Sequence, residues 1–161
     1  EGYTVTTYVD EFPDELAASL CVLMGQLAVD APTGAVEFEE EDFNTERLKE
    51  RYATAAAMDR SLYETVALAA DGTVAAQSTL AVAKGDGTDV FQWGTFVHRE
   101  HRGHRLGLAV KVANIRAVQA AHPDKQRITT QNAEQNDYMV NINKEIGFEA
   151  VEDSAEFIKR L

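Results

Sequence analysis

Cysteine and positive charge are both scarce in this sequence. Cys21 is the one cysteine in 161 residues, so an internal disulfide is excluded and a reducing compartment is favoured. It lies in the apolar run ASLCVLMG, which predicts a buried, inert thiol. Lys and Arg number 15 against 27 Asp and Glu, a formal net charge of −12. This balance argues against nucleic acid and anionic membrane surfaces as partners, and it permits a cationic substrate.

Long hydrophobic runs are absent as well. No stretch approaches the roughly 18 apolar residues of a membrane span, and the acidic, polar start EGYTVTTYVD is unlike a signal peptide. We therefore expect a cytoplasmic protein. The length predicts a single domain over residues 1–161 with a substantial core. Because the sequence does not begin with Met, we also expect a processed product or a piece of something longer.

The pattern of apolar residues predicts one α/β domain. Strands are expected at 3–9, 63–70, 73–83, 89–98 and 127–131. Helices are expected at 14–29, 44–61, 104–122 and 136–148, the second capped by Asn44 and the last ended by Gly147. Residues 149–161 are expected to form a final strand or hairpin. Turn signals at 71–72 and 85–87 favour antiparallel neighbours. The fold class is therefore α/β, with a mixed, mostly antiparallel sheet and about four helices.

The helix at 104–122 carries an apolar stripe that we expect to face the core. Its members are Leu106, Ala109, Val110, Ala113, Ala117 and Ala120. Lys111, Asn114 and Arg116 are expected to face elsewhere.

One cationic segment stands out from the acidic background. Three arginines and three histidines fall within residues 98–105, between an expected strand and an expected helix. The first N–H groups of a helix are unpaired and its dipole favours an anion there. Gly103 permits an unusual turn, and Gly107 permits a ligand or strand to come close. Arg102 and Arg105 can pair with phosphate oxygens, so the segment predicts a polyphosphate site.

Other sites fit this segment less well. The dinucleotide fingerprint Gly-x-Gly-x-x-Gly and the P-loop pattern are both absent. His98, His101 and His104 recur every three residues, but the arginines between them would repel a metal cation, so no metal site is predicted. A solvated run of charges is the remaining alternative, although it would not need glycines at a strand–helix junction.

Residues 102–107, RGHRLG, resemble the GNAT acetyltransferase signature [Gln/Arg]-x-x-Gly-x-[Gly/Ala]. Arg102 and Gly107 match it, whereas Arg105 stands where the signature has its middle glycine. The lead-in FVHREHRG is similar to the family's Val-x-Pro-x-x-Arg-Gly, with Arg99 in place of proline. Farther on, Asn136 and the pair Gly147-Phe148 keep a family spacing, in which the usual tyrosine position is Asn143. The expected order of elements also matches the GNAT fold over the whole chain.

The resemblance implies an N-acetyltransferase that moves an acetyl group from acetyl-CoA to a primary amine by direct transfer in a ternary complex. The amine would belong to a small molecule or a peptide. The family's pyrophosphate site implies binding by backbone amides of Arg102, Gly103, His104, Arg105, Leu106, Gly107 and Leu108. Val97 would offer main-chain groups to the pantetheine or the acyl carbonyl. Asn132 and Asn136 would contact the pantetheine arm, although Asn136 is equally suited to cap a helix.

The catalytic groups implied by the resemblance are only partly present. Many family members use the tyrosine as an acid for the leaving thiolate. Asn143 cannot act as an acid, but it can donate a hydrogen bond to the sulfur or to a water. Tyr138, about 140° away around the helix, is an alternative acid or simply a surface tyrosine. Gln92 and Thr95 are candidates for positioning substrate or water, or else for strand packing, because the fourth strand has no carboxylate after Asp89.

The acceptor and the partners are less clearly marked. An acidic loop carries Glu37, Glu39, Glu40, Glu41 and Asp42, which would either attract a cationic amine or simply be solvated. The chain also resembles actinobacterial GNAT proteins, some of which hold two such domains in tandem, so a homodimer or a tandem GNAT partner domain is compatible with it. A catalytically silent GNAT module that binds CoA or supports a larger protein remains the alternative function.

Overall fold

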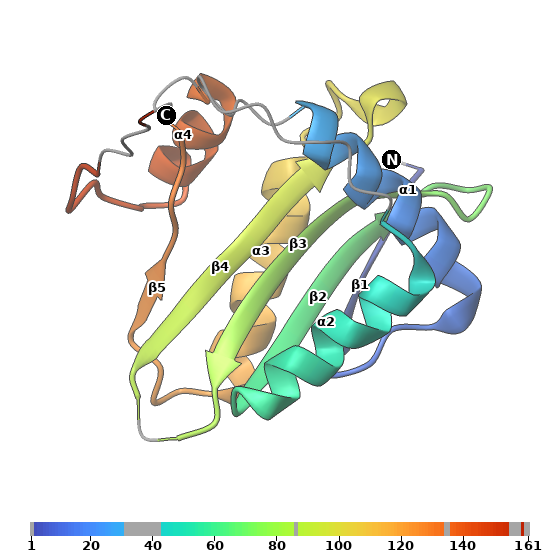
Figure 1. Ribbon diagram of the computed structural model, residues 1–161. Helices are drawn as coiled ribbons and strands as arrows, with labels where there is room; N and C mark the ends of the chain where they lie inside the picture. The colour runs from blue at the N-terminus through green and yellow to red at the C-terminus, as the bar shows by residue number, and fades with distance from the viewer. Residues whose placement is uncertain (1, 31–42, 86, 134–135, 155–158, 160–161) are drawn as a thin grey trace.

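A five-stranded sheet with the order β1-β2-β3-β4-β5 forms the centre of the computed structural model (Figure 1). The structure describes residues 2–30, 43–85, 87–133, 136–154 and 159. The strands are β1 (Thr4–Val9), β2 (Arg60–Leu68), β3 (Val74–Ala83), β4 (Asp89–Val97) and β5 (Arg127–Thr129). The first four pair antiparallel, whereas β5 runs parallel to β4. The expected α/β fold with a mostly antiparallel sheet is confirmed.

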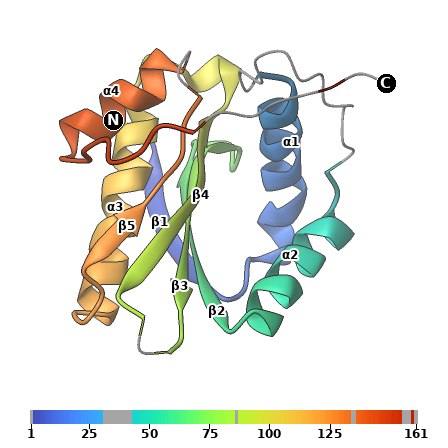
Figure 2. The same cartoon turned by 60° about the vertical axis from the view of Figure 1, so that its left-hand side comes forward.

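Helices cover both faces of this sheet (Figures 1 and 2). On one face lie α1 (Asp14–Asp30) and α2 (Thr45–Ala57), and on the other lies α3 (Leu106–Ala121). A short 3-10 helix, η1 (Arg99–His101), links β4 to α3, and α4 (Asp137–Glu145) follows β5. The hydrophobic core therefore has one part on each face of the sheet. Residues of α1 and α2 pack on Val66 and Val74, while Val118 of α3 packs on Leu80 and Val82.

Local sequence signals explain the helix ends. The Asn44 side chain accepts hydrogen bonds from the N–H groups of Glu46 and Arg47, at 3.1 and 3.0 Å, and so caps α2 as expected. Gly147, at a φ of +88°, follows the end of α4 and takes the left-handed conformation that glycine allows. Cys21 is buried, and burial raises the pKa of its thiol. The expected burial of this thiol is confirmed.

Two expectations about the elements are wrong. Residues 149–154 form no strand; all of them are exposed, and Glu149, Glu152 and Asp153 are acidic residues of kinds that are depleted in sheets. The rest of that expected strand, apart from Lys159, lies outside the described residues. On α3 the buried face is also rotated from the expected stripe. Lys111 and Asn114 are buried, whereas Ala109 and Ala120 are exposed.

The rotation of α3 has a physical reason in the sheet below it. The Asn114 amide donates to the backbone carbonyls of Tyr63 and Ser78, at 2.9 and 2.6 Å. These bonds satisfy a buried polar side chain, which makes its burial acceptable. Alanine loses little when it is exposed, so the alanines of the expected stripe do not compete for the core.

The strands β4 and β5 separate soon after they begin. Their pairing covers three positions, from Asp89 with Arg127 to Phe91 with Thr129. β5 ends opposite Phe91, and the chain after it leads away from β4 (Figure 1), so among the described residues no strand pairs with this edge of β4 from Gln92 to Val97. A bulge lies in the same stretch, because Thr79 pairs with Gly94 while Leu80 pairs with Gln92, leaving Trp93 as the extra residue.

Candidate functional site

The cationic segment forms the connection between β4 and α3, as the sequence predicted. Two of its residues have left-handed backbones: Gly103 at a φ of +85° and Arg105 at +56°. Arg105 therefore takes the conformation that glycine adopts most easily, at the position where the GNAT signature has glycine. Arg105 thus differs from the signature in its side chain, while its backbone adopts a conformation that glycine tolerates.

The start of α3 has no side-chain cap, unlike α2 and α4, which are capped by asparagines. No side chain of the described residues therefore caps the first amides of this helix, at its positive end. The surrounding Arg102, Gly103, His104 and Arg105 are exposed, and Leu106 is buried. This arrangement can bind an anion through backbone N–H groups and flanking cations.

Gly107 lies where α3, α4 and β4 meet. A Cβ atom there would lie 3.3 Å from Cγ2 of Val97 and 3.4 Å from Cδ1 of Ile142. The sequence predicted that a ligand or a strand could come close to Gly107, and the structure shows the close approach of strand β4. Val97 is buried, with 6% of its surface exposed, and a contact of its main chain with a ligand stays a prediction.

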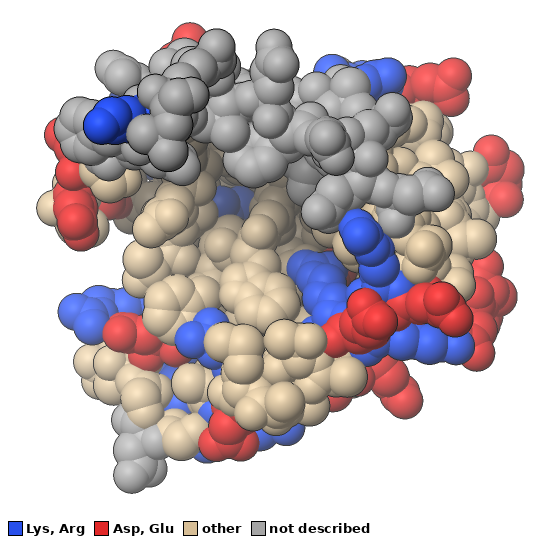
Figure 3. Space-filling view, viewed as in Figure 1, with Lys and Arg blue, Asp and Glu red and all other residues tan. Residues whose placement is uncertain are grey.

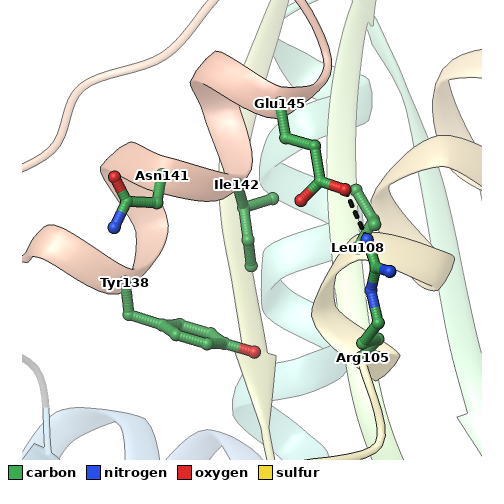
Figure 4. A pocket seen from close by; sticks show the side chains of 6 residues that line it. All are labelled: Arg105, Leu108, Tyr138, Asn141, Ile142 and Glu145. Carbon is green, nitrogen blue, oxygen red and sulfur yellow. Dashed lines mark hydrogen bonds and ion pairs between the residues drawn. The ribbon is translucent and has the colours of Figure 1, made fainter.

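A cavity of about 170 Å³ lies between the start of α3 and α4 (Figure 4). Its lining is Arg105, Leu108, Tyr138, Asn141, Ile142 and Glu145. Arg105 and Glu145 form an ion pair across it. The Tyr138 ring points from α4 toward the start of α3 and is 58% exposed. A second hollow of about 440 Å³ follows the outer face of α3 from His104 to Arg116.

The histidines of the segment have partners within the protein. His98 Nε2 lies 2.9 Å from the amide nitrogen of Gln26, and His101 Nδ1 lies 3.0 Å from the hydroxyl of Tyr3. The ring of His104 lies 5.7 Å from that of Tyr3. In the part of the chain that the structure describes, no group of three or more His, Cys, Asp or Glu could hold a metal ion.

Asn143 lies on the buried side of α4, with 6% of its surface exposed. Its Oδ1 accepts a hydrogen bond from Nζ of Lys111, which is 1% exposed. The Lys111 ammonium also lies 5.0 Å from the centre of the Phe148 ring. Burial lowers the pKa of Lys111 to about 8. The structure thus brings Asn143 together with a cation that the sequence prediction placed on the outside.

A sequence signal for Lys111 does exist. Gly107, Lys111, Asn114 and Val118 have the spacing of one helix face, and all four are buried. Two polar residues on a face otherwise made of small or apolar ones indicate partners from another element. Tyr138, five residues before Asn143, points into the cavity instead, so the two candidates for assisting the leaving group lie in different surroundings.

Gln92 is held by the bulge of β4. Its amide nitrogen donates to the carbonyls of Thr79 and Gly94, at 2.7 and 2.8 Å, and to the Ser78 hydroxyl at 3.2 Å. Its Oε1 is buried and accepts no hydrogen bond from a described residue. Thr95 shares a 3.1 Å hydrogen bond with Ser78. The positioning of substrate or water by Gln92 and Thr95 stays a prediction.

The two asparagines predicted to meet pantetheine lie near the start of α4. Asn136 caps this helix, because its side chain accepts from the Met139 N–H at 3.2 Å. Asn132 is exposed in the segment between β5 and α4. A contact of either residue with a cofactor stays a prediction.

A second polar cluster lies on the face of α1 and α2, and no sequence pattern predicted it. Glu64 of β2 is fully buried, and burial raises its pKa while Arg51 opposes the rise. Arg51 lies 3.2 Å from the Glu64 carboxylate, donates to the Thr79 hydroxyl at 2.9 Å, and stacks 5.6 Å from the Trp93 ring. Figure 3 shows this face hollowed beside α2, with Lys or Arg atoms in the hollow. The acidic loop at 37–42 lies outside the described residues.

The chain is similar to several proteins of known structure. No protein-family model and no curated protein matches the chain. A tandem GNAT protein from the clavulanic acid biosynthesis pathway is 30% identical over 92% of this chain, with a TM-score of 0.75, and the match spans 42% of that protein. A GNAT superfamily phosphinothricin acetyltransferase from Sinorhizobium meliloti, in complex with acetyl-CoA, is 16% identical over 92% of this chain and 76% of its own, with a TM-score of 0.69.

An aminoglycoside 6′-N-acetyltransferase from Acinetobacter baumannii is 16% identical over 99% of both chains, with a TM-score of 0.63. Among the described residues, no helix has the length and apolar character to cross a membrane. The strand order, the four α-helices and these likenesses agree with one another. The chain has the GNAT fold, and its structural neighbours are GNAT acetyltransferases.

Proposed function

We propose that this protein belongs to the GNAT superfamily and transfers the acetyl group of acetyl-CoA to a primary amine of a small molecule or peptide. The observation that carries the proposal is the uncapped start of α3, reached through two left-handed residues that follow β4, whose outer edge has no strand partner from Gln92 to Val97. The likeness to an acetyltransferase in complex with acetyl-CoA supports it. Because the chain spans 42% of the tandem GNAT protein, a second GNAT domain or a second copy is the proposed partner.

In this proposal, backbone amides of residues 102–108 bind the pyrophosphate of CoA. Arg102 and Arg105 add charge at the same point. The pantetheine arm lies along the edge of β4 from Gln92 to Val97, where main-chain groups lack a strand partner and can pair with its amides as they would with an added strand. Asn132 and Asn136 flank the arm from the side of α4. The reactive group is the thioester of acetyl-CoA, which donates the acetyl group.

The protein's own groups then have three tasks. The amine must lose a proton to water or a base, the oxyanion must be stabilised, and the thiolate must leave. A backbone N–H of β4 beside the bulge stabilises the oxyanion. Asn143 donates a hydrogen bond to the leaving sulfur, and Tyr138 is the alternative donor. Gln92 holds the bulge in shape and positions the groups around it.

The acceptor amine approaches from the face of α1 and α2. Trp93 is the extra residue of the bulge, is 36% exposed, and stacks with Arg51 on this face. An amine above Trp93 would meet the acyl carbonyl held on the β4 edge. The aminoglycoside acetyltransferase among the structural neighbours supports aminoglycosides as one class to test, beside polyamines and peptides.

Release of the CoA thiol from acetyl-CoA tests this function. With a panel of aminoglycosides, polyamines, small amines and peptides, we expect at least one amine to raise thiol release above hydrolysis, and Arg105→Glu to abolish the gain. The alternative, a catalytically silent CoA-binding module, is favoured by Asn143 at the tyrosine position. It predicts acetyl-CoA binding without turnover for every amine in the panel.

A further inference from the structure

Lys111 is a buried cation without a carboxylate partner among the described residues. It is 1% exposed, and its ammonium meets the Asn143 amide and the Phe148 ring, which are both uncharged. Burying an ammonium against uncharged groups costs stability, and an apolar side chain of similar volume avoids the cost. Packing alone therefore does not explain a lysine at this position.

The end of α4 holds both neighbours of Lys111 in place. The N–H groups of Gly147 and Phe148 donate to the carbonyls of Lys144 and Asn143, at 3.1 and 2.9 Å. With the left-handed Gly147, these bonds form a Schellman motif. The motif turns the chain back at Phe148, so that its ring and the Asn143 amide both meet the Lys111 ammonium.

The lysine also determines how the Asn143 amide is oriented. An ammonium is only a donor, so Asn143 must present Oδ1 to it and hold Nδ2 on its other edge. No described residue accepts a hydrogen bond from that Nδ2. The preceding residue, Ile142, reaches Gly107 beside Val97, which places this turn of α4 at the carboxyl end of β4. A fixed donor thus lies on the turn of α4 that packs beside Gly107 and Val97.

We propose that Lys111 is a positioning residue for acetyl transfer: its ammonium fixes Asn143 with Nδ2 toward the sulfur of CoA and stabilises the thiolate through that amide. The inference rests on the proposed function. When the tetrahedral intermediate collapses, the C–S bond breaks and its electron pair stays on sulfur. The thiolate accepts the Nδ2 hydrogen bond and then takes a proton from water, and the hydroxide left behind is neutralised by the proton that the amine has lost.

The charge required for this role is present at neutral pH, since burial lowers the pKa of Lys111 only to about 8. A nearby positive charge lowers the pKa of an acidic group by about 1 to 3. Because the charge acts through an amide, we expect the thiol of bound CoA to have a pKa about 1 below that of free CoA.

The test is an ultraviolet titration of the thiolate of CoA bound to the full chain. The same titration with desulfo-CoA, which lacks the thiol, is subtracted, and calorimetry gives each affinity. Lys111→Met removes the charge, and Lys111→Gln also does so while keeping a donor for Asn143. Lys125→Met is the matched control, because Lys125 is also well covered but binds the carbonyls of Gly85 and Gly87.

We expect wild type and Lys125→Met to lower the thiol pKa, and both Lys111 variants to return it to the value of free CoA without losing CoA binding. A thiol pKa that is equal in wild type and the Lys111 variants overturns the inference and leaves the proposed function intact. Absence of CoA binding to wild type overturns the proposed function and the inference together. If Lys111→Met does not fold, Lys111→Gln decides the outcome.

Discussion

Arg105 and Glu145 form an ion pair across the cavity between the start of α3 and α4 (Figure 4). Their side chains are 71% and 53% exposed, and a surface pair of this kind contributes about 0 to 1 kcal/mol. In the proposed complex the same guanidinium binds phosphate, so the carboxylate of Glu145 competes with the ligand.

Glu145→Gln should therefore tighten CoA binding. Removing a competing interaction of up to about 1 kcal/mol predicts an affinity gain of about two- to fivefold, with little change in stability. Calorimetry on wild type and variant measures the gain. Weaker binding by Glu145→Gln would show that Glu145 supports the site and does not compete with the ligand.

Arg105→Gly distinguishes the effect of the backbone conformation of this residue on stability from the effect of its side-chain charge on CoA binding. A left-handed conformation costs a non-glycine residue about 1 to 2 kcal/mol, which glycine does not pay. We expect the variant to unfold at higher urea concentration than wild type and to bind CoA more weakly. Lower stability of the variant would contradict backbone strain at Arg105. Unchanged affinity for CoA would exclude a phosphate contact by the Arg105 side chain.

Lys111→Met should stabilise the protein at neutral pH. The pKa of Lys111 falls from 10.5 to about 8 on folding, so the unfolded chain binds this proton more tightly than the folded one. The cost of burial is fully present below pH 8, at about 3 kcal/mol, and disappears as the pH rises through 10.5.

The predicted gain for Lys111→Met is about 1 to 3 kcal/mol at pH 7, after the lost Asn143 hydrogen bond is counted, and it shrinks toward pH 10. Urea denaturation at both pH values measures it, with Lys125→Met as the control for removing a covered lysine elsewhere in the chain. A destabilised Lys111→Met at pH 7 would mean that the lysine is kept for the fold.

Trp93→Ala should weaken the use of the acceptor amine and leave the use of acetyl-CoA unchanged. The ring is 36% exposed on the face of α1 and α2, away from the start of α3. Loss of one aromatic contact predicts a KM for the amine raised about tenfold, with the KM for acetyl-CoA unchanged. Steady-state kinetics with each substrate varied in turn measure both values. Equal rises in both KM values would indicate a general distortion of β4.

Regular elements were predictable because their signals are local. Apolar runs and turn signals marked β1 to β4, and the caps Asn44 and Asn136 marked helix starts. The strand–helix junction around Gly103 followed from glycines and charge in a short segment. These features need no knowledge of the rest of the chain.

The partners of the site residues were not predictable in this way. Lys111 meets Asn143 from 32 positions away, and Arg105 meets Glu145 from 40 positions away. Both pairs exist because α4 docks beside α3, which no local pattern reveals. The error on α3 has the same origin, since whether a helical lysine is outside or inside depends on the element that covers it.

Calorimetric titration of acetyl-CoA into wild type and Arg105→Glu, at moderate salt, tests the central claim most directly. We expect micromolar binding by wild type that is lost in Arg105→Glu, because the reversed charge repels the pyrophosphate at the start of α3. Equal binding by both proteins, or no binding by wild type, would contradict the assignment of this junction as the CoA site.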